Sequence, residues 1–331
     1  MWRRFRRDSL AVVAFIAVAT TVAMIVLGST VRVTNSGMGC RSWPLCNGQL
    51  GPIDHFHALL EQSHRYLATV VSVFVVLTGV LAWRDRARRP GVLAPALAAV
   101  GALVVQVALG ALTVLAHNAG WTVGLHLVCA EILLALLAVA AFRAVLPGES
   151  TGRLPDRPAH RRLVDRQPYP GDGRRRSGGD PSAIAAVALL LATIVAGTLV
   201  VDGGAEEACP AWPLCPAGSP GHLVALQLVH RGFAAAAGIA VLVWSVRLWR
   251  RHQRRVASAV LVALLALQGA AGGITAVLEA RAGAADLHLA LGTLLWLAAV
   301  VLAVGGSPAL PALTDAGRPR EPLAATGGAP R

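Results

Sequence analysis

The sequence predicts an all-α integral membrane protein whose eight transmembrane helices form two tandem four-helix bundles. Three observations predict this fold. The 331 residues are 55% hydrophobic and only 14% charged, whereas a soluble domain carries about 25% charged residues. The apolar residues gather into eight runs that are long enough to cross a bilayer. The second half of the chain repeats motifs of the first half in the same order, which is typical of a duplicated unit.

The eight apolar runs are separated by polar segments. They cover residues 10–29, 62–83, 92–115, 121–146, 182–201, 223–249, 256–278 and 284–305. The first run follows a cluster of arginines and has no evident small-residue cleavage site. We therefore expect it to be an uncleaved first helix rather than a signal peptide.

The arginines predict the orientation of the spans. All thirty basic residues are arginine, and only five are expected on the outer side: Arg32, Arg41, Arg65, Arg231 and Arg281. Because short cytoplasmic loops collect basic residues, both termini are predicted to be cytoplasmic in a multi-pass protein of a bacterial-type cell membrane. The net charge of +13 is attributed to clusters that face anionic lipid, so no nucleic-acid partner is expected.

Composition divides the chain into four parts. Residues 1–146 contain the first four spans and residues 182–306 the last four. The Arg-, Pro- and Gly-rich stretch 147–181 is predicted to be a flexible cytoplasmic linker, and 307–331 a disordered tail. Since each half has an even number of spans, the halves are predicted to be related by a pseudo-twofold axis along the membrane normal.

Short matching segments carry the internal repeat. The matched pairs are 28–32 with 197–201, 40–46 with 209–215, 64–65 with 230–231, 106–113 with 268–275, and 125–127 with 287–289. They recur in the same order in both halves, so each feature of one bundle should have a counterpart in the other.

Four histidines occupy matching positions at the outer ends of spans. His64 and His126 begin the second and fourth spans, and His230 and His288 begin the sixth and eighth. Two imidazoles at one depth on separate helices can bind a haem iron from both faces. A single histidine in a span is more often a packing or relay residue, so the haem prediction depends on the repetition. Zinc is disfavoured, because no cysteine or carboxylate completes a tetrahedral set at that depth.

Glu61 breaks the repeat, since Gln227 stands at the matching position. Glu61 and His64 are three residues apart and would share one face of a helix. A carboxylate one turn from a haem ligand can pass a proton or stabilise a developing positive charge. The alternative is a charge that the helix dipole favours near an N-terminus. We therefore predict a catalytic N-terminal half, and a resident electron-transfer or structural haem in the C-terminal half.

Further polar residues surround both sites on the outer side. Arg65 and Arg231 are candidates for binding haem propionates, or alternatively lipid phosphates. The outer loops hold two cysteine pairs, Cys40 with Cys46 and Cys209 with Cys215. Both pairs are predicted to be structural disulfides, with a redox role as the alternative for the first. His57 is expected in an exposed loop, and the role of Glu131 inside the fourth span is left open.

Glu61, the four histidines, their neighbouring arginines and the cysteine pairs together resemble the haem A synthase family. The resemblance covers nearly the whole chain except the linker and the tail. It implies a haem-dependent membrane oxidoreductase that converts haem O to haem A by two successive hydroxylations of a ring methyl group to a formyl group, for cytochrome c oxidase biogenesis.

The resemblance also implies roles for individual residues and partners. His64 and His126 would hold the substrate haem, with Glu61 taking part in the chemistry. His230 and His288 would hold haem b. Haem O would come from a haem O synthase, and oxidase assembly factors and an unidentified electron donor would be partners. The sequence leaves open whether the protein forms a homo-oligomer.

Two other classes of protein remain as alternatives. A dihaem b-type membrane cytochrome that only passes electrons would explain the four histidines, but not the difference between Glu61 and Gln227. A transporter would need charged or unwound sites near the middle of the bilayer, and Glu131 is nearly the only charge predicted there.

Overall fold

The computed structural model describes residues 2–50, 54–146, 180–213, 215, 221–250, 254–278 and 282–305, with side chains from Ser9 onward. These residues form the helices α1 (Trp2–Val33), α2 (Phe56–Arg84), α3 (Pro90–Leu115), α4 (Gly120–Val145), α5 (Pro181–Asp202), α6 (Gly221–Arg250), α7 (Arg255–Val277) and α8 (Ala282–Gly305). Each of the eight contains a segment long and apolar enough to cross a membrane. The predicted all-α fold with eight membrane-spanning helices is confirmed for the described residues. The predicted tail and all but the last two residues of the predicted linker lie outside them.

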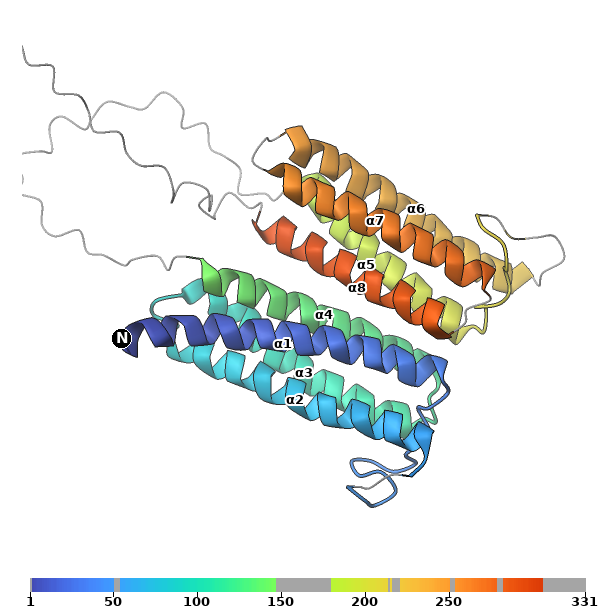
Figure 1. Ribbon diagram of the computed structural model, residues 1–331, viewed down its shortest axis with the longest axis horizontal. Helices are drawn as coiled ribbons and strands as arrows, with labels where there is room; N and C mark the ends of the chain where they lie inside the picture. The colour runs from blue at the N-terminus through green and yellow to red at the C-terminus, as the bar shows by residue number, and fades with distance from the viewer. Residues whose placement is uncertain are drawn as a thin grey trace, which may run out of the picture.

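The helices form two groups of four that lie side by side (Figure 1). In the first group α1 and α3 each pack against both α2 and α4, and in the second group α5 and α7 stand in the same relation to α6 and α8. The groups meet through α1 with α8, α4 with α5, and α4 with α8. Under the internal repeat α1 corresponds to α5 and α4 to α8, so the first two of these contacts are counterparts of one another.

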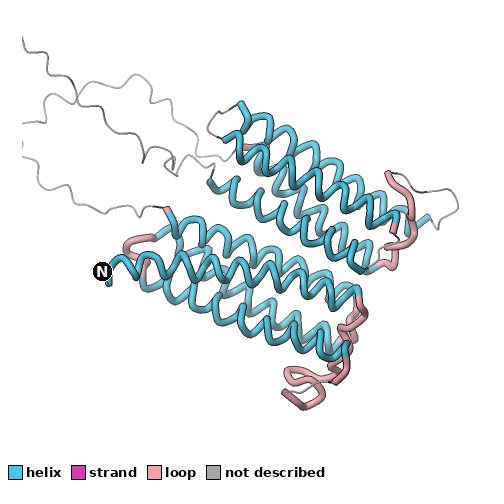
Figure 2. Tube along the Cα trace, viewed as in Figure 1, coloured by secondary structure: helices cyan, strands magenta, loops and turns pink. Residues whose placement is uncertain are grey.

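The loops gather at the two ends of the helices (Figure 2). Within each group the buried residues are mostly alanine, valine and leucine, and Trp244 and Trp296 fill the core of the second group. Small side chains let membrane helices approach closely, which matters because lipid offers no hydrophobic drive for helix association. A third cluster of buried residues joins α1, α4 and α8 and includes Ile25, Ala130 and Leu134.

The described helices extend beyond the apolar runs at the outer end of the first bundle. Helix α1 continues to Val33, and α2 begins at Phe56, six residues before the predicted start at 62. His57, expected in a loop, therefore lies in the first turn of α2, where its Nδ1 and Ser36 Oγ are 2.8 Å apart in a hydrogen bond. Glu61 lies beyond the first turn, which has no acidic residue. Its position is therefore not explained by the helix dipole, whose effect fades within that turn.

Candidate functional site

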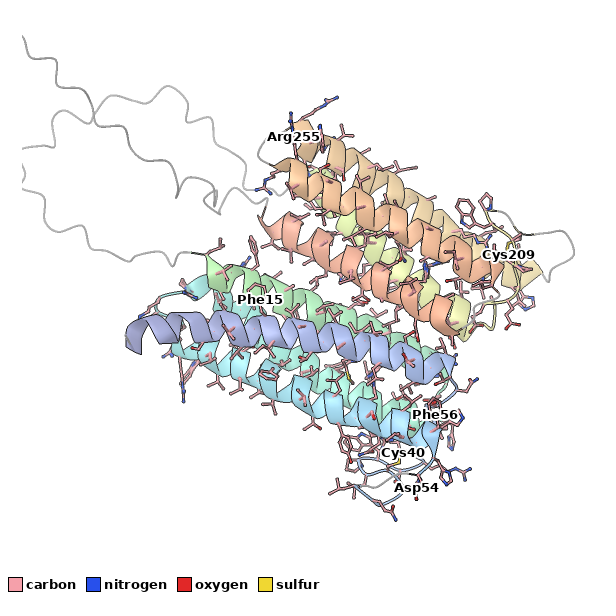
Figure 3. All side chains as sticks on the ribbon, in the orientation of Figure 1. Phe15, Cys40, Asp54, Phe56, Cys209 and Arg255 are labelled. Carbon is pink, nitrogen blue, oxygen red and sulfur yellow. A yellow bond between two sulfur atoms is a disulfide. The ribbon has the colours of Figure 1, made fainter. Side chains whose placement is uncertain are left out.

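The two cysteine loops lie at the same end of the two bundles, opposite the N-terminus (Figure 3). Disulfides join Cys40 to Cys46 and Cys209 to Cys215, as the sequence predicted. Cys129, the free cysteine among the described residues, hydrogen-bonds through its thiol to the Ala102 carbonyl. The redox role considered for the first pair stays a prediction.

Each of the four predicted ligand histidines packs against a glycine on the preceding helix. A Cβ atom at the glycine would come within 2.9–3.2 Å of the imidazole Cε1, so a larger residue would displace the ring. The pairs are Gly28 with His64, Gly110 with His126, Gly197 with His230, and Gly272 with His288. Sequence reasoning noted the repeated segments that contain these glycines but gave them no role. The feature that could have revealed this role is that a glycine recurs on the helix before each histidine.

The histidine pair of the second bundle has the spacing of two ligands on one iron. The ring centres of His230 and His288 are 6.4 Å apart, and the ring planes are inclined by 82°. Metal–imidazole bonds are about 2 Å long and the ring centre lies about 1 Å behind the nitrogen, so two imidazoles on one metal have centres about 6 Å apart. Nδ1 of His230 is 3.1 Å from the Thr193 carbonyl. It therefore donates to that oxygen, a contact that fixes the tautomer and leaves Nε2 free to bind metal.

In the histidine pair of the first bundle, some ring nitrogens have no hydrogen-bond partner. Gln106 Nε2 lies 3.2 Å from His126 Nε2, whereas Nδ1 of His64 and of His126 is buried without a hydrogen-bond partner among the described residues. Nδ1 of His288 in the second bundle is in the same state. Burying a polar nitrogen without a partner costs about 1–3 kcal/mol. The unpartnered nitrogens therefore fit a site that completes its contacts by binding a metal-containing group.

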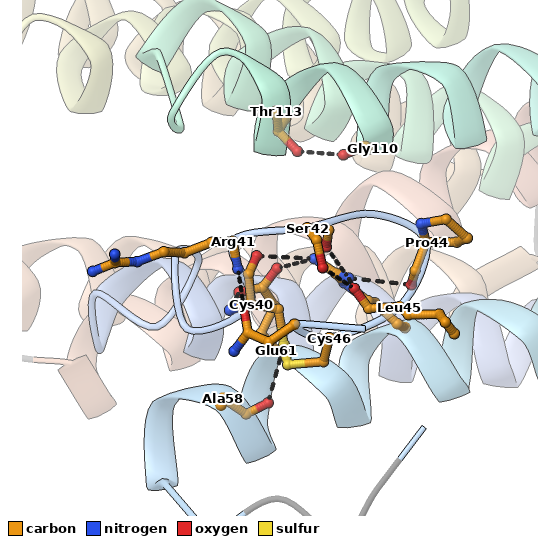
Figure 4. Close-up of polar contacts among 12 residues, drawn as sticks. Cys40, Arg41, Ser42, Pro44, Leu45, Cys46, Ala58, Glu61, Gly110 and Thr113 are labelled. Atoms are coloured by element: carbon orange, nitrogen blue, oxygen red, sulfur yellow. Dashed lines mark hydrogen bonds and ion pairs between the residues drawn. A yellow bond between two sulfur atoms is a disulfide. The ribbon is translucent and has the colours of Figure 1, made fainter. Parts of the chain in front are cut away.

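Glu61 is tied to the first disulfide loop and is only 4% exposed. Its Oε2 accepts a hydrogen bond of 2.7 Å from the Cys40 backbone N–H (Figure 4), and its Oε1 pairs with Arg65 at 2.5 Å. Gln227, the matching residue, does the opposite: its Nε2 donates to the carbonyls of Ala205 and Glu206, at 2.7 and 3.3 Å. The repeat therefore places a buried carboxyl group three residues before His64 and a neutral amide donor three residues before His230.

Arg65 and Arg231 hold the disulfide loops by similar contacts to backbone carbonyls. Arg65 donates to the carbonyls of Cys40, Ser42, Pro44 and Leu45. Arg231 donates to those of Cys209, Ala211 and Pro213, which match the first three in the repeat. Sequence reasoning did not find this role, because backbone carbonyls leave no mark in a sequence. The predicted pairing of both arginines with haem propionates stays a prediction.

The fold and the site define a multi-pass membrane protein with paired, partly buried histidines on separate helices and one carboxylate held under a disulfide loop. A profile of the cytochrome oxidase assembly protein family matches residues 11–59 and 54–300. The chain belongs to this family.

Proteins similar to the chain include heme A synthases. That of Geobacillus kaustophilus is 29% identical over 258 residues, which cover 71% of the chain and 73% of the relative. That of Lysinibacillus sphaericus is 28% identical over 301 residues, 85% of the chain and 90% of the relative. A protoheme IX farnesyltransferase of Halobacterium salinarum is 32% identical over 173 residues, which cover 51% of the chain but only 35% of that protein.

Proposed function

We propose that the protein is a haem A synthase, a membrane oxidoreductase that oxidises the methyl group of haem O to the formyl group of haem A for cytochrome c oxidase. Family membership and the relatives named heme A synthase support this activity. The observation that carries the proposal is an asymmetry between two matched sites, the buried carboxylate of Glu61 against the amide of Gln227. A cytochrome that only carries electrons has no use for this difference.

The two halves then take different haems. We assign haem O, the substrate, to His64 and His126, because Glu61 stands three residues from His64 on the same helix. We assign haem b to His230 and His288, whose ring separation fits a shared iron. Haem b would supply one-electron transfer when bound. The apolar outer surfaces of the helices suit a farnesylated substrate, which can enter from the lipid.

Glu61 is placed to hold and move a proton beside the substrate. Its carboxylate accepts from Cys40 N–H and pairs with Arg65, so its charge is compensated although it is buried. Oxidation of a methyl group releases protons, and a carboxylate can accept one and return it. The disulfide loop covers this carboxylate with Cys40 and Cys46, both buried. The loop thereby keeps bulk water from the proton-accepting group.

We also propose the orientation and the supply of substrate. With both termini in the cytoplasm, the disulfide loops face the outside, where disulfides persist. Haem O would come from an enzyme that farnesylates protohaem, the activity for which the Halobacterium relative is named. The electron donor and the oxidase assembly factors that receive haem A would be further partners.

The test is to analyse the haem content of the purified protein, expressed with and without a source of haem O. Pyridine haemochrome spectra and chromatography of extracted haems should show haem b in both cases, and haem A only when haem O is supplied. In Glu61→Gln we expect haem A to fall at least tenfold while haem b stays.

The matched control is Glu207→Gln, the same change at an exposed residue of the second outer loop, which should keep haem A formation. Two haem b per chain, unaffected by haem O, would make the protein an electron-carrying cytochrome. Full conversion of haem O to haem A in Glu61→Gln would show that Glu61 takes no part in the chemistry, while the proposed overall activity would still hold.

A further inference from the structure

A second buried carboxyl group lies where the two bundles meet. Glu131 is on α4 and is 0% exposed. Its Oε1 accepts a hydrogen bond of 2.6 Å from Thr293 Oγ1 of α8, and its backbone carbonyl accepts from Trp296 Nε1. Its Oε2 is buried and has no hydrogen-bond partner among the described residues. Packing alone does not explain this buried carboxyl group, since one of its two oxygens has no hydrogen bond.

The position of Glu131 relates it to both histidine pairs. Glu131 follows His126 by five residues, and Thr293 follows His288 by five, so the two residues that share the hydrogen bond are counterparts in the repeat. A residue that contacts its own counterpart lies at the axis of a twofold arrangement. Five helical residues span about 7.5 Å. The carboxyl group is therefore about equally far along the helices from a ligand of each predicted haem.

The surroundings of Glu131 contain no compensating charge. Helix α4 packs against α1, α3, α5 and α8. No Asp, Glu, Lys or Arg occurs on them in residues 10–31, 90–115, 181–201 and 287–305, and His288 is the one histidine in those ranges. On α4 itself the neighbouring ionisable groups are His126 and Cys129, whose thiol faces Ala102. In so apolar a setting a charge interacts strongly with any other charge nearby, because little solvent screens it.

We propose that Glu131 is a proton-accepting group for the haem site of His230 and His288. His230 and His288 would hold the haem b iron, which would take up one electron from an external one-electron reductant and so change from ferric to ferrous. Glu131 would take up one proton from the bulk solvent with that electron and change from a carboxylate to a carboxylic acid, so the net charge of the site would stay the same. Glu131 would return the proton to the solvent when the electron leaves. The assignment rests on the proposed function, which supplies the haems.

The test is a potentiometric titration of haem b in the purified holoprotein at a series of pH values, with an electrode and redox mediators as the reductant. Because the reduced state would bind the extra proton, the midpoint potential of the wild type should fall as pH rises. In Glu131→Gln, which keeps the shape and an acceptor for Thr293, the potential should not respond to pH in the same range. In Thr293→Val the midpoint potential should still respond to pH, but over a different pH range. Glu207→Gln should behave as the wild type.

A second measurement does not depend on the folding of a variant. The infrared difference spectrum between oxidised and reduced wild-type protein should contain a carboxylic acid C=O band that shifts in D₂O. The band should be missing in Glu131→Gln if that variant retains haem b. A wild-type spectrum without the band, or an unchanged pH response in Glu131→Gln, would overturn the inference while haem A synthesis still stands. Purified wild type without haem b would instead overturn the proposed function, and the inference with it.

Discussion

Glu61 and Gln227 occupy matching positions, yet their side chains meet opposite hydrogen-bonding partners. A carboxylate only accepts, whereas an amide also donates. Glu61 accepts from a backbone N–H and an arginine, and Gln227 donates to two carbonyls. An amide in place of Glu61 would turn an N–H group towards Cys40 N–H or Arg65. The exchange of an oxygen for an amide nitrogen therefore changes which loop groups the side chain can bind.

The glycines beneath the histidines give a prediction at the residue scale. In Gly272→Ala the new Cβ would lie 2.9 Å from His288 Cε1, so the imidazole must move. We expect haem b content to fall at least tenfold, because His288 is the proposed ligand and a ligand must be held within about 0.5 Å of its productive position. The measurement is the ratio of haem b to protein after purification.

Gly269→Ala is the matched control for this prediction. Gly269 lies on the same helix, and a Cβ there would meet nothing within 4 Å. This variant should retain haem b, and alanine should if anything favour the helix. Equal haem content in both variants would contradict the idea that Gly272 seats the ligand.

At the scale of the elements, each disulfide loop depends on one arginine of the helix that follows it, Arg65 of α2 or Arg231 of α6. Arg231→Ala removes the donor that three carbonyls of the second loop share. Hydrogen bonds to a charged group are worth about 1.5–3 kcal/mol each, less where they are exposed. We therefore expect the loop 203–213 to open more easily by roughly 1–3 kcal/mol. Hydrogen–deuterium exchange of the loop amides would measure this change.

Arg247→Ala on the same helix provides the comparison. Arg247 is exposed and pairs with Asp180 at 3.4 Å, and such surface pairs contribute about 0–1 kcal/mol. Exchange in the loop should be unchanged in this variant. If Arg231→Ala also left exchange unchanged, the disulfide alone would be holding the loop.

The sequence predicted the elements well where lipid dictates their composition. Long apolar runs can only be helices in a bilayer, since every backbone group must be bonded internally. The start of α2 at Phe56 was not predictable by this rule, because polar residues such as His57 and Glu61 extend the helix through contacts with loop partners. The contacts of Arg65 and Arg231 could not be predicted from the sequence either, because their acceptors are backbone carbonyls, which every residue has.

The candidate site was predictable only as a set of residue types. The repeat identified the four histidines and the contrast between Glu61 and Gln227. It could not predict that Thr293 would bond its own counterpart, Glu131, because that contact depends on how the bundles pack. A sequence repeat states that two halves are alike, and it does not state which of their faces meet.

At the scale of the whole molecule, the two bundles are joined by helix contacts as well as by the chain. Helix α1 packs on α8, and α4 packs on both α5 and α8. The cluster around Ile25, Ala130 and Leu134 and the hydrogen bond of Glu131 with Thr293 lie in this contact. We therefore expect the halves to stay together when a protease cuts a site introduced between residues 147 and 179.

The experiment places an affinity tag at one terminus of such a variant and cuts the purified holoprotein. The untagged half should remain bound in mild detergent, and haem b should stay at its level before cutting, because each proposed ligand pair lies within one half of the chain. The same protein without protease is the control. A cleavable variant that also carries Glu131→Leu and Thr293→Leu tests the hydrogen bond between the bundles. Hydrogen bonds between membrane helices contribute only about 0.6 kcal/mol on average. The halves should therefore still co-purify after this change. Separation of the unsubstituted halves on cutting would mean that the chain connection, and not the packing of α4 and α8, holds the bundles together.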